Sequence, residues 1–172
     1  MTTKISMDAV ISHGNDAPLD REILARPTAG PGQVLVRIKA SGVNPLDLKI
    51  RSGKAPHAKH PLPAVLGMDL AGTVEAVGDD VIAFAPGDEV YGLTGGIGGL
   101  QGSLAEFAAV DADLLAPKPA NLTMREAAAL PLVFITAWEG LVDRARVREG
   151  QKSPGSGSRR CWPNGYPDRP GL

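Results

Sequence analysis

Short segments in which every second side chain is apolar fill most of the chain before Thr123, and they restrict it to a β structure. In Gln33 to Ala40, the apolar residues Val34, Val36 and Ile38 fall on one face of an extended strand. Further strands are expected at residues 4–11, 71–77, 88–93 and 103–110, separated by turns rich in glycine and proline. The front of the chain is therefore predicted to be mostly β, with a half-buried sheet.

The pattern changes at Thr123. Thr123 and Glu126 have the spacing of a capping box, in which each side chain accepts a hydrogen bond from a backbone amide of the first helical turn. Pro131 must interrupt or kink this helix, because proline has no backbone N–H to donate. A second apolar segment, residues 133–142, follows. We therefore expect a C-terminal helical segment after the strands.

Composition excludes several classes of function. Eighteen Lys and Arg against nineteen Asp and Glu leave no basic surplus for a phosphate backbone, so nucleic acid is not an expected partner. No signal peptide and no apolar run of about eighteen residues is present, which predicts a cytoplasmic protein without a membrane partner. The single cysteine, Cys161, excludes an internal disulfide and a structural zinc site built from several thiolates.

Three segments together resemble the medium-chain dehydrogenase/reductase superfamily, and specifically its zinc-independent quinone oxidoreductase branch. They are SGVNPLDLKIRSG at residues 41–53, LPAVLGMDLAGTVEAVG at residues 62–78 and AAALPLVFITAWEGL at residues 127–141. The resemblance implies a GroES-like, partly open β-barrel with short helices. It implies a GroES-like catalytic domain at residues 1–122 and a helical connector at residues 123–152, followed by a nucleotide-binding Rossmann domain that is absent here.

The tail of the chain, residues 153–172, contains four Pro and four Gly and neither Val nor Ile, so it is predicted to be disordered. Relatives of this kind continue after Lys152 with an apolar strand, a glycine-rich turn and a helix. One permitted set of codons for the tail, read one base later, encodes VLVQGAGGVGQTVIQIARA, which is such a unit. We therefore interpret the tail as the product of a shifted reading frame, and the chain as cut off at Lys152.

Zinc binding is rejected at the residues that would carry it. The zinc-dependent members of the superfamily place a metal-binding Cys at the position of Asn44 and a metal-binding His at that of Met68. An amide and a thioether do not replace a thiolate and an imidazole as zinc ligands. His57 and His60 form an HxxH pair, but no third ligand accompanies them in the sequence. No metal site is therefore predicted.

The resemblance assigns catalytic roles to Asn44 and Asp69 and cofactor contacts to Asn44 and Thr136. Lys49, as a donor to a carbonyl or a phosphate, is a further candidate for binding the cofactor. Each residue also has a structural interpretation. Asn44 precedes a proline and would form a turn; Asp69 would accept backbone hydrogen bonds; Thr136 would bond its own helix backbone. Lys49 lies on a predicted short helix, where it would be solvated. On that helix Asp47 and Arg51 have the spacing of a solvated ion pair.

By this resemblance, the family reaction is the NADPH-dependent reduction of quinones or α,β-unsaturated carbonyls by hydride transfer without zinc. An acceptor that is already electrophilic needs no Lewis acid. The expected partner is a small quinone or enone. The family is commonly homodimeric, but the domain that usually carries the dimer contact is expected to be absent from this chain. This chain alone is expected to be inactive. The alternatives are a non-enzymatic GroES-like binding module and a fragment of a zinc-type alcohol dehydrogenase.

Overall fold

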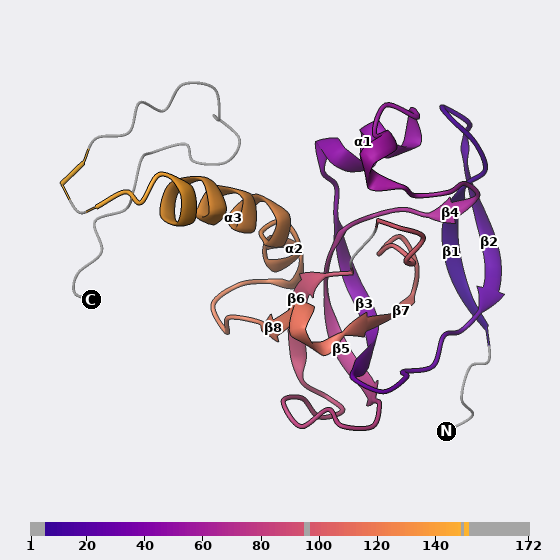
Figure 1. Cartoon of the computed structure of the whole chain (residues 1–172). Helices are drawn as coiled ribbons and strands as arrows, with labels where there is room; N and C mark the ends of the chain where they lie inside the picture. The colour runs from indigo at the N-terminus through magenta and orange to yellow at the C-terminus, as the bar shows by residue number, and fades with distance from the viewer. Residues whose placement is uncertain (1–5, 95–96, 149, 152–172) are drawn as a thin grey trace. The chain divides into compact units, whose positions relative to one another are not determined.

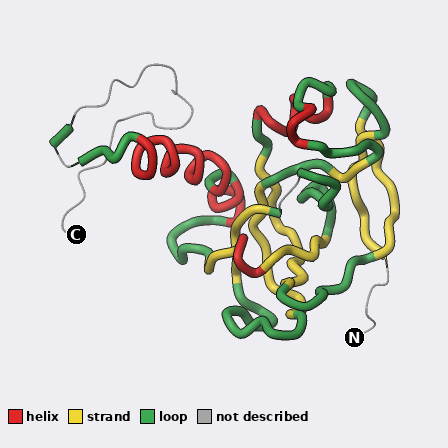
Figure 2. The backbone as a smooth tube through the Cα atoms, viewed as in Figure 1, coloured by secondary structure: helices red, strands yellow, loops and turns green. Residues whose placement is uncertain are grey.

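The computed structural model describes residues 6–94, 97–148 and 150–151. The chain divides into two compact units, Met1–Leu132 and Val133–Leu172. The first unit contains the described strands, and Figures 1 and 2 show them with short helices between them. The fold is mostly β, as predicted from the sequence. The predicted domain boundaries at residues 122 and 152 stay predictions, and the predicted frameshifted tail lies outside the described residues.

The secondary structure alternates strands with brief helical turns until α2, after which it is helical. The elements are β1 (Ser6–Ser12), β2 (Leu19–Ala25), β3 (Gln33–Gly42), α1 (Pro45–Arg51), η1 (Pro56–Ala58), β4 (Ala64–Val65), β5 (Asp69–Val77), β6 (Glu89–Leu93), β7 (Phe107–Asp111), η2 (Ala112–Leu114), β8 (Leu115–Pro117), α2 (Met124–Ala128), α3 (Pro131–Trp138) and the π-helix η3 (Glu139–Arg144).

The described strands form two antiparallel sheets that do not close into one barrel. One sheet has the order β2-β1-β4, and the other has the order β7-β3-β5-β6-β8. The largest core cluster lies on the second sheet, where its central strands β3 and β5 contribute Val34, Val36, Leu70 and Val74. Burial of these apolar side chains is the main term that holds the sheet together. The predicted GroES-like, partly open β structure is confirmed.

Most predicted strands are present, and the differences have physical causes. The last predicted strand begins late, at Phe107, because the residues before it leave the large sheet: Ala105 forms an isolated bridge with Ala9 of β1. Strand β2 was missed. It lies at the edge of its sheet, its side chains are mostly exposed and it contains three consecutive charged residues, so it shows no clear apolar alternation.

The helical segment begins as predicted. Thr123 caps α2, accepting a hydrogen bond from Glu126 N (3.3 Å), while the Glu126 carboxylate accepts one from Thr123 N (2.9 Å). Pro131 separates α2 from α3 and occupies the first turn of α3, where a missing N–H costs nothing. No helix in the described part of the chain is long and apolar enough to cross a membrane.

Candidate active site

Asn44 lies between β3 and α1, at the N-cap of the helix. Its backbone is extended (φ −115°, ψ 156°), which is the conformation that the following Pro45 favours. Pro45 in turn begins the helix without wasting a backbone donor. Asn44 is only 5% exposed; the local sequence accounts for its backbone conformation, and the folded chain around it accounts for its burial.

Asp69, the first residue of β5, holds the Asn44 side chain. It pairs in register with Gly42 on β3, and Gly42 lies two residues before Asn44 in the chain. This pairing brings Asp69 close to Asn44. The Asn44 amide Nδ2 donates to Asp69 Oδ2 (2.9 Å), and the backbone N–H of Leu132 donates to Asp69 Oδ1 (3.0 Å). Asp69 is 1% exposed. Two predicted site residues therefore lie together, 25 residues apart in sequence.

Asp47 is a second buried carboxylate beside Asn44. Its Oδ2 accepts a hydrogen bond from the backbone N–H of Asn44 (2.7 Å), so it caps the start of α1. The predicted solvated pair with Arg51 is wrong, because Asp47 is buried and the Arg51 guanidinium donates instead to the Ala17 carbonyl (2.8 Å). The spacing suggested the pair, but the packing of α1 in the folded chain, where Ile50 joins a core cluster with Ala55, Ala58 and Leu66, decides which side faces water.

Burial controls the charge of this cluster. It raises the pKa of Asp69 from 3.8 to about 6, even though the hydrogen bonds from Asn44 and Leu132 favour the ionised form, and the nearby Asp47 charge adds to the rise. Burial also raises the pKa of Asp47, against the effect of the backbone N–H groups of Asn44 and Gly67. Two carboxyl groups with raised pKa values, Asp47 and Asp69, therefore accept hydrogen bonds from Asn44.

This raised pKa predicts a pH-dependent stability. Because folded Asp69 binds its proton more tightly than the unfolded residue, the free energy of unfolding should rise as the pH falls through about 6. From about pH 7.5 to pH 5, we expect the wild-type chain to gain about 1 kcal/mol relative to Asp69→Asn, which has no carboxyl to titrate there. Urea unfolding of both proteins measures the difference. The difference in free energy of unfolding between the two proteins should not change with pH above about pH 7. A difference that stays constant down to about pH 5 would contradict the raised pKa of Asp69.

The remaining predicted residues occupy other positions. Lys49 is exposed on α1, and Thr136 is exposed on α3 in the second unit. Met68 is buried, 6% exposed, next to Asp69. The described residues contain no group of three or more His, Cys, Asp or Glu side chains that could hold a metal ion. The roles assigned to Asn44, Asp69, Lys49 and Thr136 stay predictions.

Two features of the site were missed from sequence. Val43 directly precedes Asn44, and Leu48 lies four residues after it on α1; they are 70% and 58% exposed, so apolar side chains near Asn44 in the chain face outward. Their proximity to Asn44 in the sequence was a usable signal. The hydrogen bond from the Leu132 backbone to Asp69 was not predictable, because it joins residues 63 positions apart.

The two open antiparallel sheets, with a buried Asn–Asp pair where β3 meets α1, define a GroES-like domain of the kind found in oxidoreductases. The family model of the alcohol dehydrogenase GroES-like domain matches residues 30–120. The chain belongs to this family, within the medium-chain dehydrogenase/reductase superfamily.

Known relatives agree with this assignment. The chain is 45% identical over 120 residues to the NADPH-dependent alkenal/one oxidoreductase, chloroplastic, of Arabidopsis thaliana, a match that covers 67% of this chain and 31% of that protein. It is 42% identical over 125 residues to the quinone oxidoreductase of Mus musculus, covering 73% of this chain and 36% of that one. The chain thus spans about a third of these relatives, which are oxidoreductases.

A solved structure is also similar. The crystal structure of an alcohol dehydrogenase superfamily protein from Novosphingobium aromaticivorans is 67% identical and superposes with a TM-score of 0.83, covering 84% of this chain and 44% of that chain. The sheets and the α1 region therefore follow an arrangement that is already known from an experimental structure.

Proposed function

We propose that this chain forms the acceptor-side domain of an enzyme that reduces quinones or α,β-unsaturated carbonyls with NADPH. The observation that carries the proposal is the Asn44–Asp69 pair, a buried amide held by a buried carboxylate, with the exposed apolar residues Val43 and Leu48 one and four positions from Asn44 in the chain. An oriented amide near exposed apolar side chains suits a flat apolar acceptor with a carbonyl oxygen. Relatives named as quinone and alkenal/one oxidoreductases support this class of acceptor.

In this proposal Asp69 is a positioning residue. Its Oδ2 fixes the Asn44 amide, while its Oδ1 is occupied by the Leu132 N–H. Asn44 Nδ2 carries a second N–H that can donate to an acceptor oxygen as negative charge develops on it. A donor that is already oriented costs little reorganisation at that moment, which is the usual basis of oxyanion stabilisation.

Zinc has no part in the proposed reaction. Asn44 and Met68, at the two zinc-ligand positions of the zinc-dependent relatives, offer an amide and a thioether. The Asn44 amide already donates to Asp69, so this donor set does not fit zinc. A quinone or an enone is electrophilic enough to accept hydride without a Lewis acid. Asn44 then does by hydrogen bonding part of what a metal does for less activated substrates.

NADPH supplies the hydride when it is bound. Asn44, Lys49 and Thr136 are the residues of this chain that we assign to it. No strand–GxGxxG–helix unit occurs among the described residues, so its pyrophosphate would be held by a nucleotide-binding domain. The NADPH-dependent relative from Arabidopsis supports this cofactor.

The proposal predicts that turnover needs both parts. The purified 172-residue chain should not oxidise NADPH in the presence of 1,4-benzoquinone or 3-buten-2-one. A chimera in which residues 6–148 replace the matching part of the Novosphingobium protein should do so. Absorbance of NADPH measures both, with mouse quinone oxidoreductase as the positive control. A folded chimera without turnover on either acceptor would contradict the proposed function. Turnover by the chain alone would contradict the need for a separate nucleotide-binding domain.

A further inference from the structure

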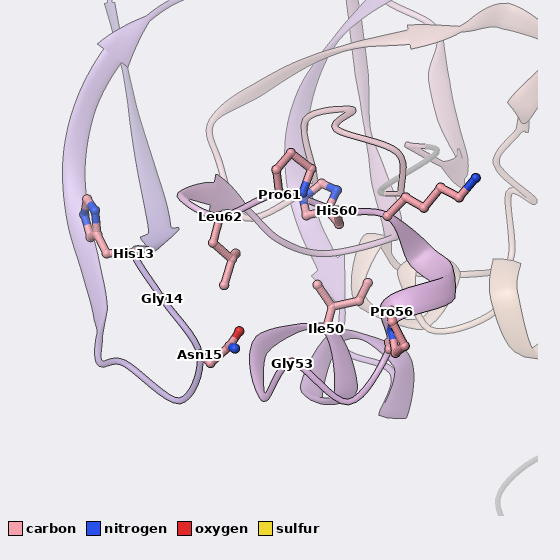
Figure 3. Close-up of a pocket in the computed structure, with 11 residues that line it drawn as sticks. His13, Gly14, Asn15, Ile50, Gly53, Pro56, His60, Pro61 and Leu62 are labelled. Atoms are coloured by element: carbon pink, nitrogen blue, oxygen red, sulfur yellow. The ribbon is translucent and has the colours of Figure 1, made fainter.

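A hollow of about 640 Å³ lies at the other end of α1 from Asn44. Its walls are the turn after β1, the C-terminal part of α1 and the loop from Gly53 to Leu62 (Figure 3). Asn44 and Asp69 are not among the residues that line it. The volume is typical of pockets that hold a small organic molecule. The pocket is therefore separate from the candidate active site, and an inference about it does not depend on the proposed function.

The walls of the pocket are tied together. The backbone N–H of Asp16 donates to the Arg51 carbonyl (2.9 Å), and Arg51 Nη2 donates to the Ala17 carbonyl (2.8 Å), so the turn is fixed to the end of α1. The Asn15 side chain lies against Gly53, where any Cβ would collide with it. A ligand would thus meet a preformed pocket and would spend little binding energy on ordering its walls.

The lining combines an apolar floor with polar donors. Ile50 and Leu62 belong to a core cluster and give the floor, and Figure 3 shows their side chains between the turn of Asn15 and the loop of His60. Lys59 and Asn15 are exposed at the rim. The lining residues are His13, Gly14, Asn15, Ile50, Gly53, Ala55, Pro56, Lys59, His60, Pro61 and Leu62, and none is acidic.

The charge around the pocket differs between its two walls. Residues 48–68 contain four Lys and Arg and no Asp or Glu, although the whole chain has a net charge of −1. On the opposite wall, Asp16 follows Asn15 in the chain, the Glu22 carboxylate is held by His13 Nε2 (2.6 Å), and Asp20 Oδ2 lies 4.0 Å from the same nitrogen. The Lys59 side of the rim therefore favours an anionic group.

We propose that this pocket binds a small organic carboxylate with an apolar body. The carboxylate would meet the Lys59 ammonium at the rim, and the apolar body would cover Ile50 and Leu62. Inorganic phosphate fits less well, because it leaves the apolar floor in water. A neutral molecule of the same shape fits less well too, because it does not use the charge of Lys59.

Octanoate is the probe that tests this site on the purified chain. The chain has only three histidines, and their imidazole NMR signals report on the pocket: His13 and His60 line it, and His57, on η1, does not. Octanoate should shift the signals of His13 and His60 in a saturable way and those of His57 much less. Octanamide should bind about fivefold more weakly, the scale of one exposed ion pair, and the octanoate affinity should fall with added salt.

Lys59→Gln should weaken octanoate binding by about fivefold, and Lys59→Arg should retain it. Lys39→Gln is the matched control, because Lys39 is also exposed but lines a different hollow. It should leave the affinity unchanged. The proposal is overturned if octanoate causes no saturable shift, if octanamide binds as tightly, if inorganic phosphate shifts the same signals at lower concentration, or if the two glutamine variants behave alike.

Discussion

Gly42→Ala should lower the free energy of unfolding of the chain by about 3 kcal/mol, a large loss for a single methyl group. Gly42 ends β3 directly beneath α2, and a Cβ at this position would overlap the backbone carbonyl of Ala128. It would also come within 2.9 Å of the Asp69 Cβ. The main obstacle is backbone, which cannot rotate away as a flexible side chain can. Either α2 or the end of β3 must move.

Urea unfolding measures this loss, and Gly14→Ala is the matched control. The nearest atom to a Cβ at Gly14 is the Ala17 Cβ at 4.0 Å, an ordinary contact, so this variant should stay within about 0.5 kcal/mol of wild type. If Gly42→Ala is as stable as Gly14→Ala, the close packing of α2 on β3 is wrong. A shift of α2 would also disturb the Asp69–Asn44 pair, because Asp69 lies beside the same contact.

Asn44→Ala should lower kcat/KM of the active chimera by about 100-fold, mainly through kcat, because it removes the donor that we assign to the acceptor oxygen. Asn121→Ala, at an exposed asparagine before α2, is the matched control and should leave kcat/KM unchanged. Steady-state rates with 1,4-benzoquinone measure both. An Asn44→Ala chimera that is folded and retains most of its kcat would remove Asn44 from the mechanism.

The same assay separates a positioning role of Asp69 from a merely structural one. In the parent chimera, kcat should fall as the pH drops below about 6, because protonation of Asp69 weakens its hold on the Asn44 amide. Asp69→Asn should be slower, by about tenfold, but should lose this pH dependence. If the wild-type and variant profiles have the same shape, Asp69 does not act through Asn44.

The strands that could be predicted from sequence are those with apolar residues at alternate positions. Gln33 to Ala40 shows this pattern and forms β3, which the structure extends to Gly42, although both faces of the strand are buried from Val34 to Val36. Strand β2 lies at a sheet edge where neither face is consistently buried, so its residues carry no such signal. The helix start at Thr123 was predictable for a different reason: a capping box is a local interaction, complete within four residues.

The sequence predicted which residues belong to the candidate site but not how they contact one another. Asn44 and Asp69 follow from the resemblance, and Pro45 alone predicts the extended backbone of Asn44. Their contact depends on the register of β3 against β5, which brings Gly42 opposite Asp69. Helical spacing alone predicted Asp47 to be a surface residue. Its burial depends on which face of α1 the rest of the folded chain covers.

The sequence by itself therefore determined the mostly β class of this chain, the local starts of its helices and the family to which it belongs. These depend on periodicity and on short-range motifs. Only the tertiary structure decided that Asp69 is held between Asn44 and the Leu132 backbone and that burial raises its pKa to about 6. It also decided that a pocket, whose walls are joined by hydrogen bonds, lies at the C-terminal end of α1. Each of these depends on residues distant in sequence, and desolvation acts only on groups that the folded chain has removed from water.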